Sequence, residues 1–136
     1  MSHRPDPRPL KVFIADDSPP VAEMLSELLA ATGVVEVVGI AETEDATVDA
    51  IRRLRPDVVV LDLQLKGGSG TNVIRAVRAR HELASVHLMV TSNHDSPQLR
   101  AGCLQLGANG YFDKVKELPE LTGRIRALAD EKARDA

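Results

Sequence analysis

The chain has 136 residues, enough for one domain with a hydrophobic core and too few for two. Its mildly acidic net charge of −3 is not typical of a nucleic-acid binder, and its aromatic content of 2% argues against base-stacking surfaces. The single cysteine, Cys103, excludes an intramolecular disulfide framework, and no apolar run approaches the roughly 18 residues of a membrane span. We therefore expect a cytoplasmic domain without membrane insertion.

The ends of the chain differ in composition from its middle. Residues 1–9 are polar and hold three prolines, which predicts a flexible or extended lead-in. Residues 130–136 are mostly charged, and we expect them to fray. The domain itself is expected to span residues 10–129, so the sequence predicts one domain with nothing left over.

Between these ends, short apolar runs alternate with segments of helical periodicity. Ser18 followed by Pro19 predicts one helix start, Ser69 or Thr71 another, and Ser96 followed by Pro97 a third. The predicted strands cover residues 12–15, 35–40, 58–61, 86–90 and 110–112. The predicted helices begin near residues 19, 46, 70, 97 and 118 and end near residues 32, 54, 77, 106 and 128.

The pattern therefore consists of five strand–helix units. The run from Val58 to Leu61 is apolar at every position, which indicates a strand buried on both faces of a parallel sheet. Right-handed crossovers then give an α/β, doubly wound, three-layer flavodoxin-like fold, and we expect the strand order 2-1-3-4-5. Five units are too few for an eight-stranded barrel.

Polar side chains follow four of the five predicted strands. Asp16 and Asp17 follow the first predicted strand, and Asp62 follows the third. Thr91 lies at the end of the fourth strand, and Lys114 follows the fifth. The second strand ends without a comparable cluster. In a doubly wound sheet these strand ends meet at one edge, where ligands bind. Each residue alone also fits an ordinary turn or helix cap, so the prediction depends on their joint placement.

Three carboxylates at one edge would repel one another, and a divalent cation removes that repulsion. The potential ligands are all oxygen atoms, which suits Mg²⁺ rather than Zn²⁺. An aspartate beside Mg²⁺, a lysine and a hydroxyl is a plausible acceptor of a phosphoryl group. The carboxylate would attack phosphorus, while Mg²⁺, Lys114 and Thr91 would stabilise the phosphoryl oxygens.

Four segments of the chain resemble the receiver domain of bacterial two-component response regulators, over about Lys11 to Leu128. They are Val12-Phe13-Ile14-Ala15-Asp16-Asp17-Ser18, Arg55-Pro56-Asp57-Val58-Val59-Val60-Leu61-Asp62-Leu63, Val90-Thr91-Ser92, and Gly107-Ala108-Asn109-Gly110-Tyr111-Phe112-Asp113-Lys114. The resemblance implies a single-domain regulator that is not an enzyme, accepts phosphate from a histidine kinase or histidine phosphotransfer protein, and passes its signal by protein binding or phosphorelay. Its expected oligomeric state is a monomer or a phosphorylation-dependent dimer.

The resemblance also assigns roles to individual residues. Asp62 is the implied phosphorylated aspartate, and Asp16, Asp17, Asp62 and the backbone carbonyl of Gln64 are the implied ligands of Mg²⁺. Lys114 binds the phosphoryl group, Thr91 is the switch hydroxyl and Tyr111 the switch aromatic, swinging from exposed to buried. Gln64 and Asn93 are candidates for setting the phosphoryl lifetime. The downstream protein is expected on the face of the fourth helix, fifth strand and fifth helix.

Two positions depart from the family's pattern. Lys66 occupies the place of a usual proline four residues after the phosphorylated aspartate, and Val115 occupies the place of a usual proline after the lysine. A cis bond before a non-proline residue costs about 3 kcal/mol, so we expect Lys114–Val115 to be trans, or cis at a cost in strain.

Three other functions remain open at this point. A pseudo-receiver scaffold would use the fold without phosphorylation. A Mg²⁺-dependent phosphohydrolase would usually carry a second acid two residues after the nucleophile, where this chain has Gln64. A flavodoxin-like cofactor binder would need a phosphate cradle, whereas the loop after the first strand is anionic and has no glycine.

Overall fold

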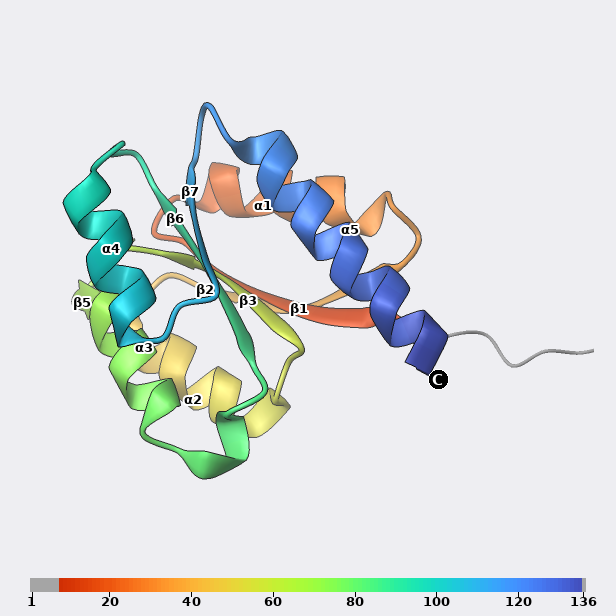
Figure 1. The fold of residues 1–136 in the computed structure, drawn as a ribbon, viewed down its shortest axis with the longest axis horizontal. Coiled ribbons are helices and arrows are strands. Elements are labelled where there is room, and N and C mark those ends of the chain that lie inside the picture. The colour runs from red at the N-terminus through yellow and green to blue at the C-terminus, as the bar shows by residue number, and fades with distance from the viewer. Residues whose placement is uncertain (1–7, 136) are drawn as a thin grey trace, which may run out of the picture.

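The computed structural model describes residues 8–135, in which strands and helices alternate along the chain (Figure 1). The strands are β1 (Leu10–Ala15), β2 (Val35–Ala41), β3 (Val58–Asp62), β4 (Gln64–Leu65), β5 (Gly68–Ser69), β6 (His87–Ser92) and β7 (Gly110–Asp113). The helices are α1 (Pro19–Ala30), α2 (Glu44–Leu54), α3 (Gly70–Arg78), the short 3₁₀ helix η1 (His81–Leu83), α4 (Pro97–Leu106) and α5 (Leu118–Asp135).

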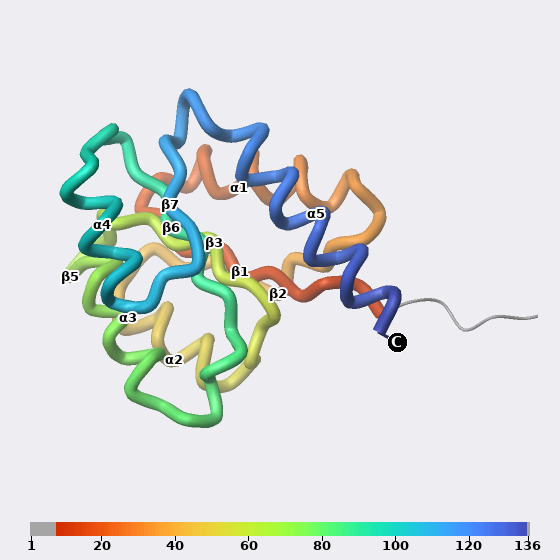
Figure 2. The backbone as a smooth tube through the Cα atoms, in the orientation of Figure 1, coloured from red at the N-terminus to blue at the C-terminus, as the bar shows by residue number. Residues whose placement is uncertain are grey.

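Five parallel strands form the central sheet in the order β2-β1-β3-β6-β7. This confirms the predicted order, because β6 and β7 are the fourth and fifth of the predicted strands. Helices α1 and α5 cover one face and α2, α3 and α4 cover the other (Figures 1 and 2). Every residue of β3 is buried, as its unbroken apolar run predicts for a strand covered on both faces.

Each face of the sheet has its own hydrophobic core. Ile14, Leu29 and Ile125 belong to the core beneath α1 and α5, and Ile51, Ile74 and Leu88 belong to the core beneath α2, α3 and α4. These side chains are all less than 2% exposed. None of the helices found between residues 8 and 135 has the combined length and apolarity needed to cross a membrane.

The helix starts fall at the predicted cap residues. Ser18 is the N-cap of α1 with proline in the first turn, although its side chain makes no capping hydrogen bond. Ser69, rather than Thr71, caps α3 through its side chain, and Ser96 caps α4 in the same way. Gly107 ends α4 with a φ of 116°, a left-handed conformation that favours glycine.

The C-terminal prediction was wrong over the residues that the structure describes. Helix α5 continues to Asp135, so residues 130–135 are helical rather than frayed. The Lys132 Nζ atom holds this last turn in place, because it lies 2.7 Å from Asp57 Oδ2 and donates to the backbone carbonyl of Pro9 at 3.2 Å. Residues 1–7, most of the predicted lead-in, and residue 136 lie outside the described residues.

A half-buried arginine, Arg78, ties together the segments at the amino ends of β6 and β7. The Arg78 guanidinium donates to the carbonyls of Gly107 at 2.9 Å and Val86 at 2.8 Å, with longer bonds to the carbonyls at the end of η1. It also donates to Asn109 Oδ1 at 2.9 Å, and that oxygen accepts from the Leu88 amide as well. One side chain therefore connects α3, η1, β6 and the turn before β7.

Candidate functional site

The register of the sheet brings the predicted site residues to one edge. Asp62 pairs with Thr91 across β3 and β6, and Ala15, directly before Asp16, pairs with Leu61 across β1 and β3. On the other side of β6, Ser92 pairs with Asp113, directly before Lys114. The carboxyl ends of β1, β3, β6 and β7 are therefore level with one another.

Three carboxylates and one ammonium group form the centre of this edge, which we call the acidic pocket (Asp16, Asp17, Asp62 and Lys114). One oxygen from each aspartate lies within 4.8 Å of the others. Lys114 Nζ lies 2.8 Å from Asp62 Oδ2 and 2.8 Å from Asp16 Oδ2. The Asp62 contact has hydrogen-bond geometry, whereas the Asp16 contact is an ion pair only, so buried Asp16 Oδ2 lacks a hydrogen-bond donor among the described residues.

Burial dominates the electrostatics of the pocket. It raises the pKa of the Asp62 carboxyl above the usual value, with a smaller contribution from the Asp16 charge, despite opposition from Lys114 and from the Gln64 amide. Burial alone would lower the pKa of Lys114, but its contacts with Asp16 and Asp62 outweigh that effect and raise it. The pocket thus holds more negative charge than its one lysine neutralises.

The pocket fits a hard divalent cation. The potential ligand atoms of the three aspartates are all carboxylate oxygens, and buried Asp16 Oδ2 has no hydrogen-bond donor among the described residues. A cation there would offset the repulsion among the three carboxylates. The Gln64 amide donates to Asp62 Oδ1 at 3.0 Å, which brings the backbone of Gln64 against the Asp62 carboxylate.

Both residues of the predicted switch pair, Thr91 and Tyr111, are buried. Thr91 is 2% exposed, and its hydroxyl oxygen has no hydrogen-bond partner among the described residues. Tyr111 is equally buried, its hydroxyl donates to the His94 carbonyl at 2.8 Å, and the Arg100 guanidinium lies 5.0 Å from its ring centre. Of the two predicted positions of Tyr111, the structure has the buried one.

The two candidates for setting the phosphoryl lifetime, Gln64 and Asn93, are both exposed. His94 is also exposed. The described residues contain no cis peptide bond, so the bond between Lys114 and Val115 is trans. This is the first of the two conformations predicted for it.

Sequence reasoning missed the loop after β2. Glu42 and Glu44 contact the segment that follows Asp62, and Lys66 Nζ lies 2.7 Å from Glu42 Oε1. The pKa of Lys66 is raised by its hydrogen bond to Glu42, by the negative charge of Glu42 and by the negative charge of Asp17. The sequence gives only a weak signal for this contact. A glutamate after a strand is common, and the spacing between Glu42 and Lys66 does not indicate that they are in contact.

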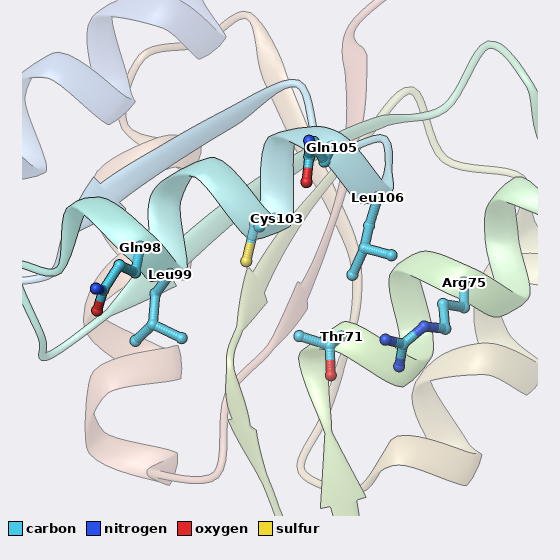
Figure 3. Close-up of a pocket in the computed structure, with 8 residues that line it drawn as sticks. Thr71, Arg75, Gln98, Leu99, Cys103, Gln105 and Leu106 are labelled. Carbon is cyan, nitrogen blue, oxygen red and sulfur yellow. The ribbon is translucent and has the colours of Figure 1, made fainter.

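A groove lies elsewhere, between α3 and α4 (Figure 3). It encloses about 680 Å³ and is lined on the α4 side by residues that include Leu99, Cys103 and Leu106, with Thr71 and Arg75 opposite. Cys103 is buried, as predicted for a core residue, and burial raises the pKa of its thiol. None of the acidic-pocket residues lines this groove.

Comparison with known proteins agrees with the geometry. The family model described as the response regulator receiver domain matches residues 12–126. The chain is 34% identical over 126 residues to the probable transcriptional regulatory protein NarL of Mycobacterium tuberculosis, covering 93% of this chain and 56% of that protein. It is 38% identical over 117 residues to the DNA-binding response regulator MtrA of Mycolicibacterium smegmatis, covering 86% and 49%.

A solved structure extends this similarity to the fold. The signal receiver domain of the putative response regulator NarL from Mycobacterium tuberculosis superposes with a TM-score of 0.83 at 32% identity, covering 91% of this chain and 98% of that one. The chain spans about half the length of the two curated relatives. The similarity therefore concerns their receiver portions.

Proposed function

The chain belongs to the response regulator receiver domain family, and on that premise we propose that it accepts a phosphoryl group on Asp62. One observation carries the proposal: Lys114 Nζ lies 2.8 Å from both Asp62 and Asp16, in a pocket with a third carboxylate at Asp17. An ordinary structural ion pair has no need of three acids around one lysine. A phosphoryl acceptor can use this arrangement, because the acids hold a divalent cation, and the cation and the lysine offset the negative charge of the incoming group.

The proposed reaction transfers the phosphoryl group from a phosphohistidine to a carboxylate. An oxygen of Asp62 attacks phosphorus, a P–O bond forms, the P–N bond breaks, and the imidazole leaves with its electron pair and takes up a proton. The donor is a histidine kinase or a histidine phosphotransfer protein. Lys114 and the Thr91 hydroxyl are the donors aimed at the phosphoryl oxygens.

Mg²⁺ is the proposed cofactor of this step, held by Asp16, Asp17, Asp62 and the backbone carbonyl of Gln64. When bound, it supplies positive charge that stabilises the transferring phosphoryl group. Asp16 and Asp17 then act only as ligands, and Asp62 combines the roles of ligand and nucleophile. Gln64 and Asn93 are neutral amides that orient water, so they set the lifetime of the product without acting as general bases.

The proposed output follows from Thr91 and Tyr111. A phosphoryl group on Asp62 attracts the unpartnered Thr91 hydroxyl, and the β6–α4 loop moves with it. Tyr111 bonds to the carbonyl of His94 in that loop, so movement of the loop reaches the face formed by α4, β7 and α5. We propose that this face binds the downstream protein, and that the domain acts as a phosphorylation-controlled switch rather than as an enzyme.

Labelling with a small phosphoryl donor tests the assignment. The wild-type protein should take up label in the presence of Mg²⁺, and Asp62→Asn should take up none. Asp57→Asn is the matched control, since it changes an aspartate at the other end of β3 and should be labelled like wild type. Labelling of Asp62→Asn would refute the assignment of the acceptor, and labelling that survives excess chelator would refute the metal's role.

A further inference from the structure

The loop that follows Asp62 is held from the side by the loop that follows β2. We call this arrangement the lateral clamp (Glu42, Glu44 and Lys66). Its backbone part consists of two hydrogen bonds: the Lys66 amide donates to the Glu42 carbonyl at 2.9 Å, and the Glu44 amide donates to the Lys66 carbonyl at 3.3 Å. Thr43 and Lys66 therefore form an isolated parallel bridge, outside the main sheet.

Side chains strengthen the same contact. Lys66 Nζ donates to Glu42 Oε1 at 2.7 Å. Glu44 Oε1 accepts from the Ser69 amide and from Asn72 Nδ2, both at 3.0 Å. The Glu44 carboxylate packs so closely over Gly68 that a Cβ atom there would overlap it. The clamp thus reaches the turn and strand β5 of the β4–β5 hairpin and the first turn of α3.

The clamped hairpin begins with a residue that contacts the acidic pocket. Gln64 pairs with Ser69 in the hairpin, and its amide donates to Asp62 Oδ1. On the other side of the clamp, the Asp16 amide donates to the Ala41 carbonyl at 3.0 Å. The end of β2 therefore contacts the segment that supplies Asp16, and the residues that follow it contact the hairpin after Asp62.

We propose that Glu44 and Lys66 are positioning residues, which hold the hairpin so that the Gln64 carbonyl is ready to bind the metal. The inference rests on the proposed function, because it concerns the same pocket. An exposed hairpin of six residues would otherwise lose conformational entropy each time a ligand binds, and ordering it in advance removes part of that cost. Residues that orient metal ligands commonly change metal affinity when they are removed.

The backbone part of the clamp requires an amide hydrogen at residue 66. Proline has none, so Lys66→Pro removes the bond to the Glu42 carbonyl together with the ammonium group. Lys66→Ala removes only the ammonium group. If the backbone bond positions the hairpin, Lys66→Pro weakens Mg²⁺ binding more than Lys66→Ala does, and equal dissociation constants for the two variants would contradict that part of the proposal.

Glu44 has a matched control in the next residue. Asp45 also lies in the first turn of α2, where an acidic side chain interacts favourably with the helix dipole, but it is exposed and lies outside the clamp. Glu44→Ala and Asp45→Ala thus both remove one acidic group from the helix start. Only Glu44→Ala also releases the Ser69 amide and the Asn72 side chain.

The experiment measures the dissociation constant of Mg²⁺ alone, by following the Gln64 amide in an NMR titration of the full chain. Glu44→Ala should weaken binding by on the order of tenfold, Asp45→Ala should not change it, and Glu44→Gln should restore most of it because the amide retains an acceptor oxygen. Titration at this amide also shows whether each variant is folded. A purely structural role would lower stability in Glu44→Ala without shifting the dissociation constant.

The outcomes separate this inference from the proposed function. Wild-type protein that neither binds Mg²⁺ nor takes label on Asp62 contradicts the proposed function and the clamp together. Wild-type protein that does both, with Glu44→Ala binding Mg²⁺ as tightly as Asp45→Ala, contradicts the clamp alone.

Discussion

Strand β3 has an aspartate–lysine pair at each end, and the two pairs differ in kind. At its amino end, Asp57 Oδ2 lies 2.7 Å from Lys132 Nζ and accepts from the Lys11 amide at 2.8 Å. At its carboxyl end, Asp62 Oδ2 lies 2.8 Å from Lys114 Nζ. The distances are nearly equal, but the Asp57 side chain is 35% exposed and the Asp62 side chain only 3%.

Charge balance separates the two ends more clearly than distance does. Lys132 serves one carboxylate, and water reaches both members of that pair. Lys114 is shared between Asp62 and Asp16, and burial keeps the pKa of Asp62 raised. The amino-end pair is a joint between α5 and the sheet, whereas the carboxyl-end pair leaves negative charge uncompensated. Such an imbalance is costly to folding and useful to a site that binds a cation and a phosphoryl group.

Removing each lysine should give the largest contrast. Lys114→Met should slow labelling of Asp62 by a small phosphoryl donor about 100-fold or more, as expected when a donor to developing negative charge is lost. Lys132→Met should leave the labelling rate unchanged, because its partner lies at the far end of β3. The measurement is the labelling rate, with circular dichroism to verify that each variant is folded. Equal rates for Lys114→Met and wild type would contradict the functional difference between the two pairs.

Asp62→Asn and Asp57→Asn should change the free energy of unfolding in opposite directions. In metal-free protein, Asp62→Asn removes a carboxylate from a crowded pocket and should raise the free energy of unfolding by about 1 kcal/mol, the usual size of a point-mutation effect. Asp57→Asn weakens a partly exposed ion pair and should lower the same quantity by roughly 0.5 kcal/mol. Urea unfolding in chelator measures both. Changes of the same sign would contradict the comparison.

Acidic pH should reduce the extra stability of the Asp62→Asn variant over metal-free wild type. Burial raises the pKa of folded Asp62 above its ordinary value of 3.8. Between these two pKa values the folded protein binds more protons than the unfolded one, so its free energy of unfolding falls as pH rises. The stability difference between Asp62→Asn and metal-free wild type should therefore be greatest at neutral pH and shrink on acidification. A difference that grows as the pH falls would reverse the assigned sign.

Much of the fold and pocket could be predicted because both follow from periodicity along the chain. An unbroken apolar run such as Val58–Leu61 marks a buried parallel strand, and the residues after such runs meet at one edge of the sheet. Asp16, Asp62, Thr91 and Lys114 were predicted from this relation alone. The roles assigned to them remain predictions until labelling is measured.

Contacts between loops could not be predicted in this way. The clamp joins Glu44, at the start of α2, to Ser69 and Asn72, and no periodic pattern relates segments that are separated by a helix and a strand. The β4–β5 hairpin was missed for the same reason: each of its strands has two residues, too few to show alternation. The helical end of α5 was missed because composition indicates exposure at Lys132 but not its partner Asp57.

The hydrogen bonds of Arg78 have a mechanical consequence for the molecule. A guanidinium group stays protonated at any ordinary pH, so its bonds to the backbone before β6 and β7 do not depend on conditions. The amino ends of these strands are thereby fixed, while their carboxyl ends support the loops around Asp62. Amide hydrogen exchange in β6 should then be slowest near Leu88 and faster toward Ser92. A movement of the β6–α4 loop should displace only the residues near that loop and not the whole strand.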